Sequence, residues 1–274
     1  MRQNLRKLRE FTSTALALGE SSRDRLAMFW RFTKNIRVQA GLGAYHPEET
    51  YSLRTRYGTL TLRDNFGDVT NLPDLFVRGV YRVTTVAGDG AILDVGANIG
   101  LFAAWVAHHN PAKRLHCFEP LSGNASLIPL NAPSAVVHRV GVGRQRSSVT
   151  LSVDKHGAMA SALPRGVETR GERFDVIPLD ELTSEAGIDQ VAFLKIDTEG
   201  MELDVLDGAT QTLTRTKRIA METHGPELHR GSVDRLLAAG FKLEDKPLKG
   251  ETRVLFAKRD QGRRARLVDT FDHR

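Results

Sequence analysis

Hydrophobic residues in the first 40 positions recur three to four apart, which is the period of an amphipathic helix. Two segments carry the pattern, residues 4–18 (NLRKLREFTSTALAL) and residues 21–36 (SSRDRLAMFWRFTKNI). Ser21 or Ser22, followed by Asp24, is a typical helix start. The pattern therefore predicts an N-terminal helical extension whose apolar stripes need a surface to pack against.

From Tyr51 the period changes to two, which is typical of a half-buried strand. Residues 51–57 (YSLRTRY) and 59–65 (TLTLRDN) alternate on either side of Gly58, and this predicts a β-hairpin. Residues 71–83 (NLPDLFVRGVYRV) are expected to form a helix that leads into the core.

Beyond residue 90, short apolar runs alternate with helical segments. The expected strands are residues 91–95, 114–120, 135–142, 148–153, 191–197, 218–225, 241–246 and 253–259. The expected helices are residues 100–109, 122–130, 200–213 and 232–240, and a glycine-punctuated loop covers residues 155–171. This alternation predicts an α/β fold, a Rossmann-like doubly wound sheet that is mostly parallel and has helices on both faces.

The composition fits a soluble globular protein with one main domain and an appendage. The chain has 274 residues, 41% of them hydrophobic, which allows one substantial core. Cys117 is the only cysteine, so no disulfide or cysteine-based zinc site can form within one chain. No apolar run approaches the roughly 20 residues that span a bilayer, and the N-terminus lacks the pattern of a signal peptide. We therefore expect a cytoplasmic protein without a transmembrane segment.

The positive charge of the chain is concentrated in the appendage. Residues 1–40 hold nine basic and three acidic residues, so they account for the whole net charge of +6, and the remainder is balanced. The charge is therefore no indication of nucleic-acid binding. We favour packing helices with a solvated basic face. The alternatives are a peripheral membrane contact, a homo-oligomer contact and a lid over the substrate.

A cofactor site is predicted where the first strand of the main domain ends, in the stretch LDVGANIG. Gly96 and Gly100 allow a tight turn close to a ligand, and Asp94 can accept a hydrogen bond from a cationic group. Glu119 follows Gly100 by nineteen residues, at the end of the second strand, where a carboxylate can hold both hydroxyls of a ribose. These features indicate an adenosine-type cofactor.

Asn98 decides between two such cofactors. A dinucleotide turn would have glycine at this position, because the missing side chain makes room for a pyrophosphate. S-adenosylmethionine has no phosphate and carries an α-amino group. The turn therefore favours S-adenosylmethionine over a nucleotide-dependent oxidoreductase, which stays an alternative together with a non-catalytic cofactor-binding module.

Several motifs together resemble the FkbM-type methyltransferases, a branch of the class I S-adenosylmethionine-dependent fold. They are ILDVGANIGLFAAWVA, HCFEP, FDVIPLDEL, FLKIDTEGMELDVLDGA and AMETHG, and the likeness runs from about residue 91 to 259. The resemblance implies a seven-stranded sheet that ends in an antiparallel hairpin, and O-methylation, often of sugar or polyketide-type hydroxyls. One departure is Arg144, which stands where the family pattern has an acid after the third strand.

The hydrophobic pattern, the charge and the resemblance together give the expected organisation of the chain and its cofactor contacts. The parts are residues 1–48 (basic helical extension), 49–90 (hairpin and lead-in helix), 91–260 (methyltransferase domain) and 261–274 (basic tail). The predicted cofactor-binding residues are Asp94, Gly96, Ala97, Asn98, Gly100, Glu119, Pro120, Val140, Gly141 and Asp197.

The predicted chemistry lies at the ends of the fourth and fifth strands, in LKIDTEG and METHG. An enzyme that transfers a methyl group to a hydroxyl must align the reactants and help the proton leave, through a base or a metal. The catalytic candidates are His224, Asp197, Glu199 and Lys195. His224 is the preferred base because histidine titrates nearest neutrality. Purely structural roles for His224 and Glu199 stay alternatives.

A divalent metal is a further alternative that we do not favour. Asp197, Glu199, Glu222 and His224 would offer oxygen and nitrogen ligands suited to Mg²⁺. The sequence as a whole predicts an S-adenosylmethionine-dependent O-methyltransferase whose acceptor is a hydroxyl of a small molecule, such as a sugar, a glycolipid or a polyketide-type natural product.

Overall fold

The computed structural model describes residues 2–152 and 171–259. The expected basic tail and all but the last residue of the expected loop at 155–171 lie outside these ranges.

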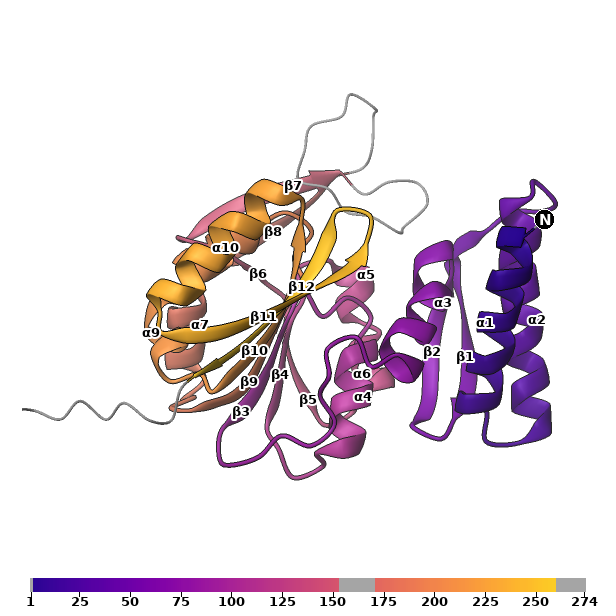
Figure 1. The fold of residues 1–274 in the computed structure, drawn as a ribbon, viewed down its shortest axis with the longest axis horizontal. Coiled ribbons are helices and arrows are strands. Elements are labelled where there is room, and N and C mark those ends of the chain that lie inside the picture. Colours follow the sequence, from indigo (N-terminus) through magenta and orange to yellow (C-terminus); the bar gives the residue numbers. More distant parts are fainter. Residues whose placement is uncertain (1, 153–170, 260–274) are drawn as a thin grey trace, which may run out of the picture.

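A seven-stranded sheet forms the centre of the larger part of the molecule, beside the N-terminal helices and hairpin (Figure 1). Its order is β11 (Phe241–Lys249), β12 (Thr252–Arg259), β10 (Arg218–His224), β9 (Val191–Ile196), β3 (Ala91–Val95), β4 (Leu115–Phe118) and β5 (Ala135–His138). The pairs from β10 to β5 are parallel, whereas β12 pairs antiparallel with both β10 and β11. The predicted fold class is therefore confirmed, including the terminal antiparallel hairpin.

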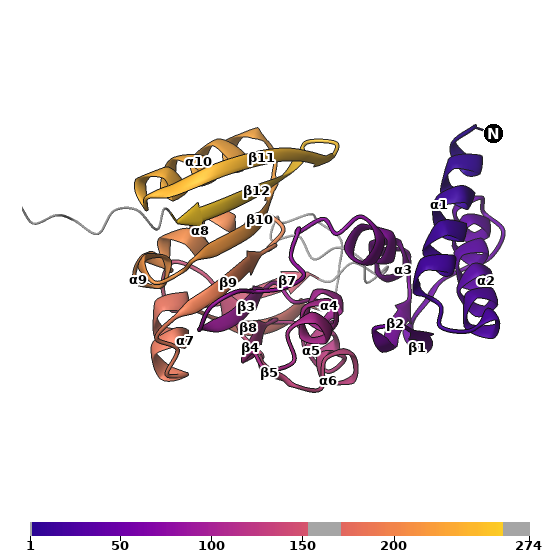
Figure 2. The same ribbon diagram turned by 60° about the horizontal axis from the view of Figure 1, so that its bottom comes forward.

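Helices cover both faces of this sheet (Figure 2). On one side lie α4 (Leu101–His109), α5 (Ser122–Ala125) and α6 (Ile128–Asn131). On the other lie α7 (Leu179–Glu185), α8 (Glu202–Asp207), α9 (Thr210–Thr214) and α10 (Pro226–Ala238). Successive residues of a strand point to opposite faces, so Ile92 belongs to the first core and Leu93 to the second. The sheet is doubly wound because both of its faces are apolar and need cover.

The N-terminal part is built from α1 (Arg2–Leu18), α2 (Ser22–Gln39) and the hairpin β1 (His46–Thr55) and β2 (Gly58–Asp64), followed by α3 (Phe66–Leu72) and a π-helical turn η1 (Pro73–Val77). Both helices and the hairpin were predicted, and Ser21 with Asp24 forms a complete capping box. The rings of Phe11 and Phe32 stack at 4.3 Å, and both belong to the core that continues into α4. The surface that the apolar stripes require is thus supplied largely within the chain.

The structure corrects several predicted boundaries. The expected helix at 71–83 ends at Val77, because Gly79 and Arg82 adopt positive φ values of 57° and 48°. The expected strand at 135–142 divides, since β5 ends at His138 and the next residues form β6 (Gly141–Val142) in a separate sheet. That sheet has the order β6, β8 (Gly171–Ile177) and β7 (Ser147–Ser152).

Two expected helices are each split into a pair of short ones. Residues 122–130 give α5 and α6, and Pro129, which lacks an N–H, stands in the first turn of α6. Residues 200–213 give α8 and α9 with Gly208 between them, where a Cβ would overlap the carbonyl oxygen of Gly143. Among the described residues no helix is both long and apolar enough to cross a bilayer. The division of the chain into four parts stays a prediction.

Candidate active site

The cofactor turn follows β3 at the carboxyl edge of the sheet and leads into α4. Gly96, Asn98 and Gly100 have φ values of 77°, 49° and 83°, all in the left-handed region. A Cβ at Gly96 would overlap the carbonyl oxygen of Asp197, so the turn lies directly against the segment after β9. Glycine is required at Gly96 by this close approach as well as by its φ.

Beneath the turn, Asp94 and Lys195 form a buried ion pair. They are register partners on β3 and β9, with Lys195 Nζ 3.1 Å from Asp94 Oδ1. Lys195 Nζ also donates to the carbonyl oxygen of Gly96 at 2.7 Å and lies 3.7 Å from Asp197 Oδ2. Burial would lower the pKa of Lys195, but the carboxylates of Asp94 and Asp197 outweigh it and raise the pKa above its usual value.

These contacts change the interpretation of two predicted residues. Asp94 has no exposed surface, and the cation that it meets is Lys195. Its predicted role toward the cofactor stays a prediction. Lys195, a catalytic candidate from sequence, has a side chain only 4% exposed and holds the turn against the sheet. Its position fits a framework residue better than one that touches a substrate.

Glu119 is buried and held in one orientation. Its Oε2 accepts from the backbone N–H of Asn98 at 2.9 Å, and its Oε1 accepts from Leu121 N at 3.0 Å and Asn124 Nδ2 at 3.2 Å. Burial raises its pKa, and the hydrogen bonds from Leu121, Asn98 and Asn124 oppose that rise. The carboxylate therefore lies beside the cofactor turn, as the spacing in the sequence predicted.

Three further predicted cofactor residues, Pro120, Val140 and Gly141, lie close to Glu119. Pro120 follows Glu119, and the backbone N–H groups of Glu119 and Val140 both donate to the carbonyl oxygen of His138. Gly141 begins β6 directly after Val140. Arg144, the departure from the family pattern, lies 2.6 Å from Asp207 and pairs with α8.

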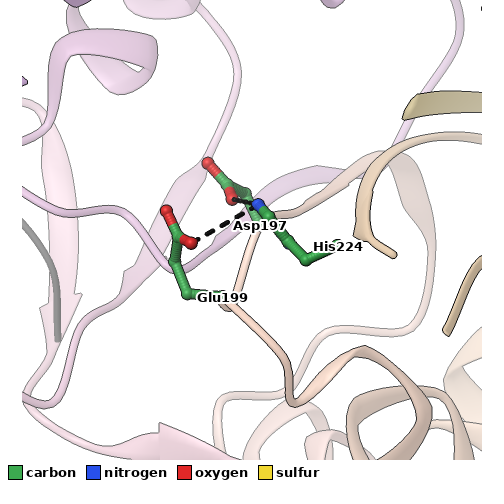
Figure 3. A group of neighbouring side chains, drawn as sticks. All are labelled: Asp197, Glu199 and His224. Atoms are coloured by element: carbon green, nitrogen blue, oxygen red, sulfur yellow. Dashed lines mark ion pairs between the residues drawn. The ribbon is translucent and has the colours of Figure 1, made fainter. Parts of the chain in front are cut away.

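The second group of predicted residues forms an acid–histidine cluster, Asp197, Glu199 and His224 (Figure 3). Asp197 follows β9 and His224 is the last residue of β10, so neighbouring strands bring them together. His224 Nε2 lies 3.5 Å from Glu199 Oε2 and 4.0 Å from Asp197 Oδ1. One ligand atom from each residue lies within 4.8 Å of the others, so the three can in principle share one cation.

Glu202, which the sequence analysis did not select, completes the surroundings of His224. It lies in the first turn of α8, is fully buried, and its Oε1 is 2.6 Å from His224 Nδ1. This contact directs Nε2 toward the two carboxylates of the cluster. The signal in the sequence was one of several acids in the segment ELDVLD, and an acid in a first helical turn is favoured by the helix dipole alone.

The electrostatics of the cluster correct the expectation that His224 titrates near neutrality. Burial alone would lower its pKa, but the hydrogen bond to Glu202 and the charges of Glu199 and Asp197 raise the pKa of His224 to about 9. His224 is therefore protonated at neutral pH in this environment. The sequence predicted the position of His224 at the end of a strand, but not the number of carboxylates that surround it.

Glu222 does not join the cluster. Its Oε1 accepts a hydrogen bond of 2.6 Å from the hydroxyl of Tyr81, which also lies 3.2 Å from Asp197 Oδ2. Burial and the charge of Asp197 raise the pKa of Glu222 to about 8. Tyr81 was missed because it lies 116 and 141 positions from these partners, and no local pattern marks it.

Comparison with known proteins identifies the domain that carries these features. Residues 94–243 match the model of the methyltransferase FkbM domain. The chain belongs to this family. The matched region contains the cofactor turn, Glu119 and the acid–histidine cluster, so these candidate residues all lie within the methyltransferase domain. The resemblance inferred from the sequence is confirmed, and the oxidoreductase alternative is not supported.

Three curated relatives are similar to this FkbM-family chain. AMB antimetabolite synthetase AmbE of Pseudomonas aeruginosa is 26% identical, over 55% of this chain and 9% of its own length. Methyltransferase 1 of Beauveria bassiana is 27% identical, over 49% of this chain and 64% of its own. 2-O-methyltransferase NoeI of Sinorhizobium fredii is 27% identical, over 53% and 68%. The chain thus spans less than two thirds of the first two relatives.

Proposed function

We propose that this protein transfers a methyl group from S-adenosylmethionine to a hydroxyl of a small molecule, such as a sugar, a glycolipid or a polyketide-type compound. The observation that carries the proposal is the acid–histidine cluster, which lies one and two strands from the cofactor turn at the same edge of the sheet. The name of the similar 2-O-methyltransferase NoeI supports oxygen as the acceptor atom.

In this reaction the hydroxyl oxygen attacks the methyl carbon as the carbon–sulfur bond breaks. The electron pair of that bond stays on sulfur, and the products are a methyl ether and S-adenosylhomocysteine. The donor is already activated by its sulfonium charge, so the protein mainly aligns oxygen, carbon and sulfur in a line and accepts the proton of the hydroxyl.

His224 is the residue we assign to that proton. With a pKa of about 9 the neutral form of His224 is the minor form at pH 7, and the rate of transfer should therefore rise with pH toward that value. In this form Nε2 is free to accept, because Nδ1 is bound to Glu202. Asp197 and Glu199 flank Nε2 and would hold the acceptor hydroxyl and stabilise the imidazolium that forms. Asp94 to Gly100 and Glu119 would hold the cofactor. Tyr81, bonded to Glu222 and close to Asp197, is a further candidate for contact with the acceptor.

A divalent cation at the same three residues is the second candidate for activating the hydroxyl. Two carboxylates and one imidazole are suitable donors for Mg²⁺ or a transition metal, and the buried Glu202 behind His224 resembles the support that metal-bound histidines receive. A bound cation would acidify the hydroxyl directly, and His224 would then be a ligand rather than the base.

The test is single-turnover transfer of a labelled methyl group to a panel of hydroxyl compounds. His224→Ala should slow the transfer by roughly 10²-fold at saturating cofactor, which is typical for a lost general base, while S-adenosylmethionine affinity is unchanged. His229→Ala is the matched control, because His229 bonds to Thr223 outside the cluster. Equal rates for His224→Ala and wild type would make His224 structural. Activity abolished by EDTA and restored by Mg²⁺ would assign the cation instead.

A further inference from the structure

Arg63 lies on β2, outside the region that matches the FkbM domain, and is fixed from one side. Its guanidinium makes a two-point contact with Asp68, at 3.0 Å from Nε and 2.7 Å from Nη2. Asp68 is 2% exposed and also accepts from the backbone N–H of Arg63 at 2.9 Å. The orientation of the guanidinium is therefore set within the N-terminal part of the chain.

The other side of the guanidinium reaches the cofactor site. Its Nη2 donates to Asn98 Oδ1 at 3.0 Å, and its Nη1 donates to Asn124 Oδ1. Asn98 donates its backbone N–H to one oxygen of Glu119, and Asn124 donates its side-chain N–H to the other. The four residues form a closed ring of hydrogen bonds in which Arg63 is the only member from the hairpin.

The ring of hydrogen bonds contacts Asn98, a residue of the cofactor turn with an unfavourable backbone conformation. Asn98 is not glycine, yet its φ of 49° lies in the left-handed region, which costs free energy that surrounding contacts must offset. Strand β2 supplies a second contact nearby, because Asn131 Nδ2 donates to the carbonyl oxygens of Thr61 and Ile99 at 2.9 Å and 2.7 Å. The hairpin is thus bonded to Asn98 directly and to Ile99 through Asn131.

We propose that Arg63 is a positioning residue for the cofactor, which holds Asn98 and Asn124 so that Glu119 faces the ribose hydroxyls in one fixed orientation. This rests on the assignment of Glu119 to the ribose. A carboxylate has about four acceptor positions, and three of those on Glu119 are taken by Asn98, Leu121 and Asn124. The one remaining position is left for a ribose hydroxyl, and the hydrogen-bonded ring determines the direction in which that position points. The N-terminal hairpin is then part of the cofactor site.

The test is calorimetry with S-adenosylmethionine on the full chain. Arg63→Met keeps an unbranched apolar stem but removes every side-chain donor, and it should weaken binding about tenfold, a loss of about 1.4 kcal/mol. Arg54→Met is the matched control: Arg54 lies on β1 of the same hairpin and pairs with Asp24, away from the turn. It should bind the cofactor as wild type does, although it removes the same charge.

A double-mutant cycle separates positioning from a general loss of structure. In the Glu119→Gln background Arg63→Met should weaken binding less than twofold further, because the group through which it acts is already changed. An equal further loss in that background, or wild-type affinity of Arg63→Met, overturns the proposal. If Arg63→Met fails to fold, Asn98→Ala takes its place in the same cycle. Wild-type affinity of Glu119→Gln would instead refute the ribose assignment itself.

Discussion

Replacing Lys195 by methionine tests whether the buried ion pair is a framework element rather than a catalytic one. Methionine fills much of the space of the lysine stem, so the main loss is the charge and not packing. Asp94, which is fully buried, would lose its partner at 3.1 Å, and the carbonyl oxygen of Gly96 would lose its donor. The variant therefore isolates the cost of an uncompensated carboxylate under the cofactor turn.

The loss in the free energy of unfolding of Lys195→Met can be estimated in two ways. Removing one partner of a buried ion pair typically costs roughly 3–5 kcal/mol. The variant can avoid a buried charge by protonating Asp94, and at pH 7 this costs about 4 kcal/mol for a carboxyl with a usual pKa near 3.9. The two bounds agree, so Lys195→Met should lower the free energy of unfolding by about 3–4 kcal/mol at pH 7.

The pH dependence distinguishes this cause from lost packing. In the variant, burial without Lys195 raises the pKa of Asp94 further above its unfolded value, so the folded state holds an extra proton. The deficit in the free energy of unfolding relative to wild type therefore grows as pH rises above the pKa of Asp94 in the folded wild type, which burial already raises. This deficit should shrink by up to about 2.7 kcal/mol from pH 7 to pH 5.

Urea unfolding at pH 7 and pH 5 measures this loss in the free energy of unfolding. The control is Lys246→Met, which replaces an exposed lysine near Glu244. Asp94→Asn in the Lys195→Met background should recover part of the loss, because it removes the buried charge. A deficit below about 1 kcal/mol, or one that does not change with pH, would refute the reasoning.

Two further predictions concern His224 and the N-terminal helices. The hydrogen bond to Glu202 helps raise the pKa of His224 to about 9, so Glu202→Gln should lower this pKa. The pH–rate profile of methyl transfer should then shift to lower pH. A profile that does not move would exclude His224 as the titrating base. Deleting residues 1–40 removes Phe11, Leu18, Met28 and Phe32 from the core, each worth roughly 1.5–3 kcal/mol. Thermal and urea unfolding should show a large loss of stability, whereas an unchanged midpoint would mean that this core contributes little.

The parts of the fold that the sequence predicted are those in which the signal is local. The two periods of 3.6 and 2 placed the N-terminal helices and the hairpin, and Ser21 with Asp24 placed the start of α2. Glycines and acids at fixed spacing placed the cofactor turn and Glu119 at the edge of the sheet. These features need only nearby residues and the rule that parallel strands end together.

The parts that could not be predicted depend on register and on distant contacts. Asp94 and Lys195 are directly opposite on neighbouring strands, but no sequence rule fixes the register of strands 101 positions apart in the chain. Arg63 reaches Asn98 across 35 positions, and Tyr81 reaches Glu222 across 141. The pKa of His224 likewise depends on three carboxylates that only the folded chain collects around it.

The cofactor turn and the acid–histidine cluster share one framework, and this bears on how the reaction can be aligned. Lys195 Nζ contacts both the carbonyl oxygen of Gly96 in the turn and Asp197 in the cluster, and Asp197 N donates to Val95 O at the end of β3. An in-line displacement tolerates little misplacement of oxygen, carbon and sulfur. Central strands position side chains more rigidly than loops do. In the proposed reaction the separation between donor and acceptor is therefore set by β3, β9 and β10, and the hairpin that carries Arg63 acts at the cofactor end.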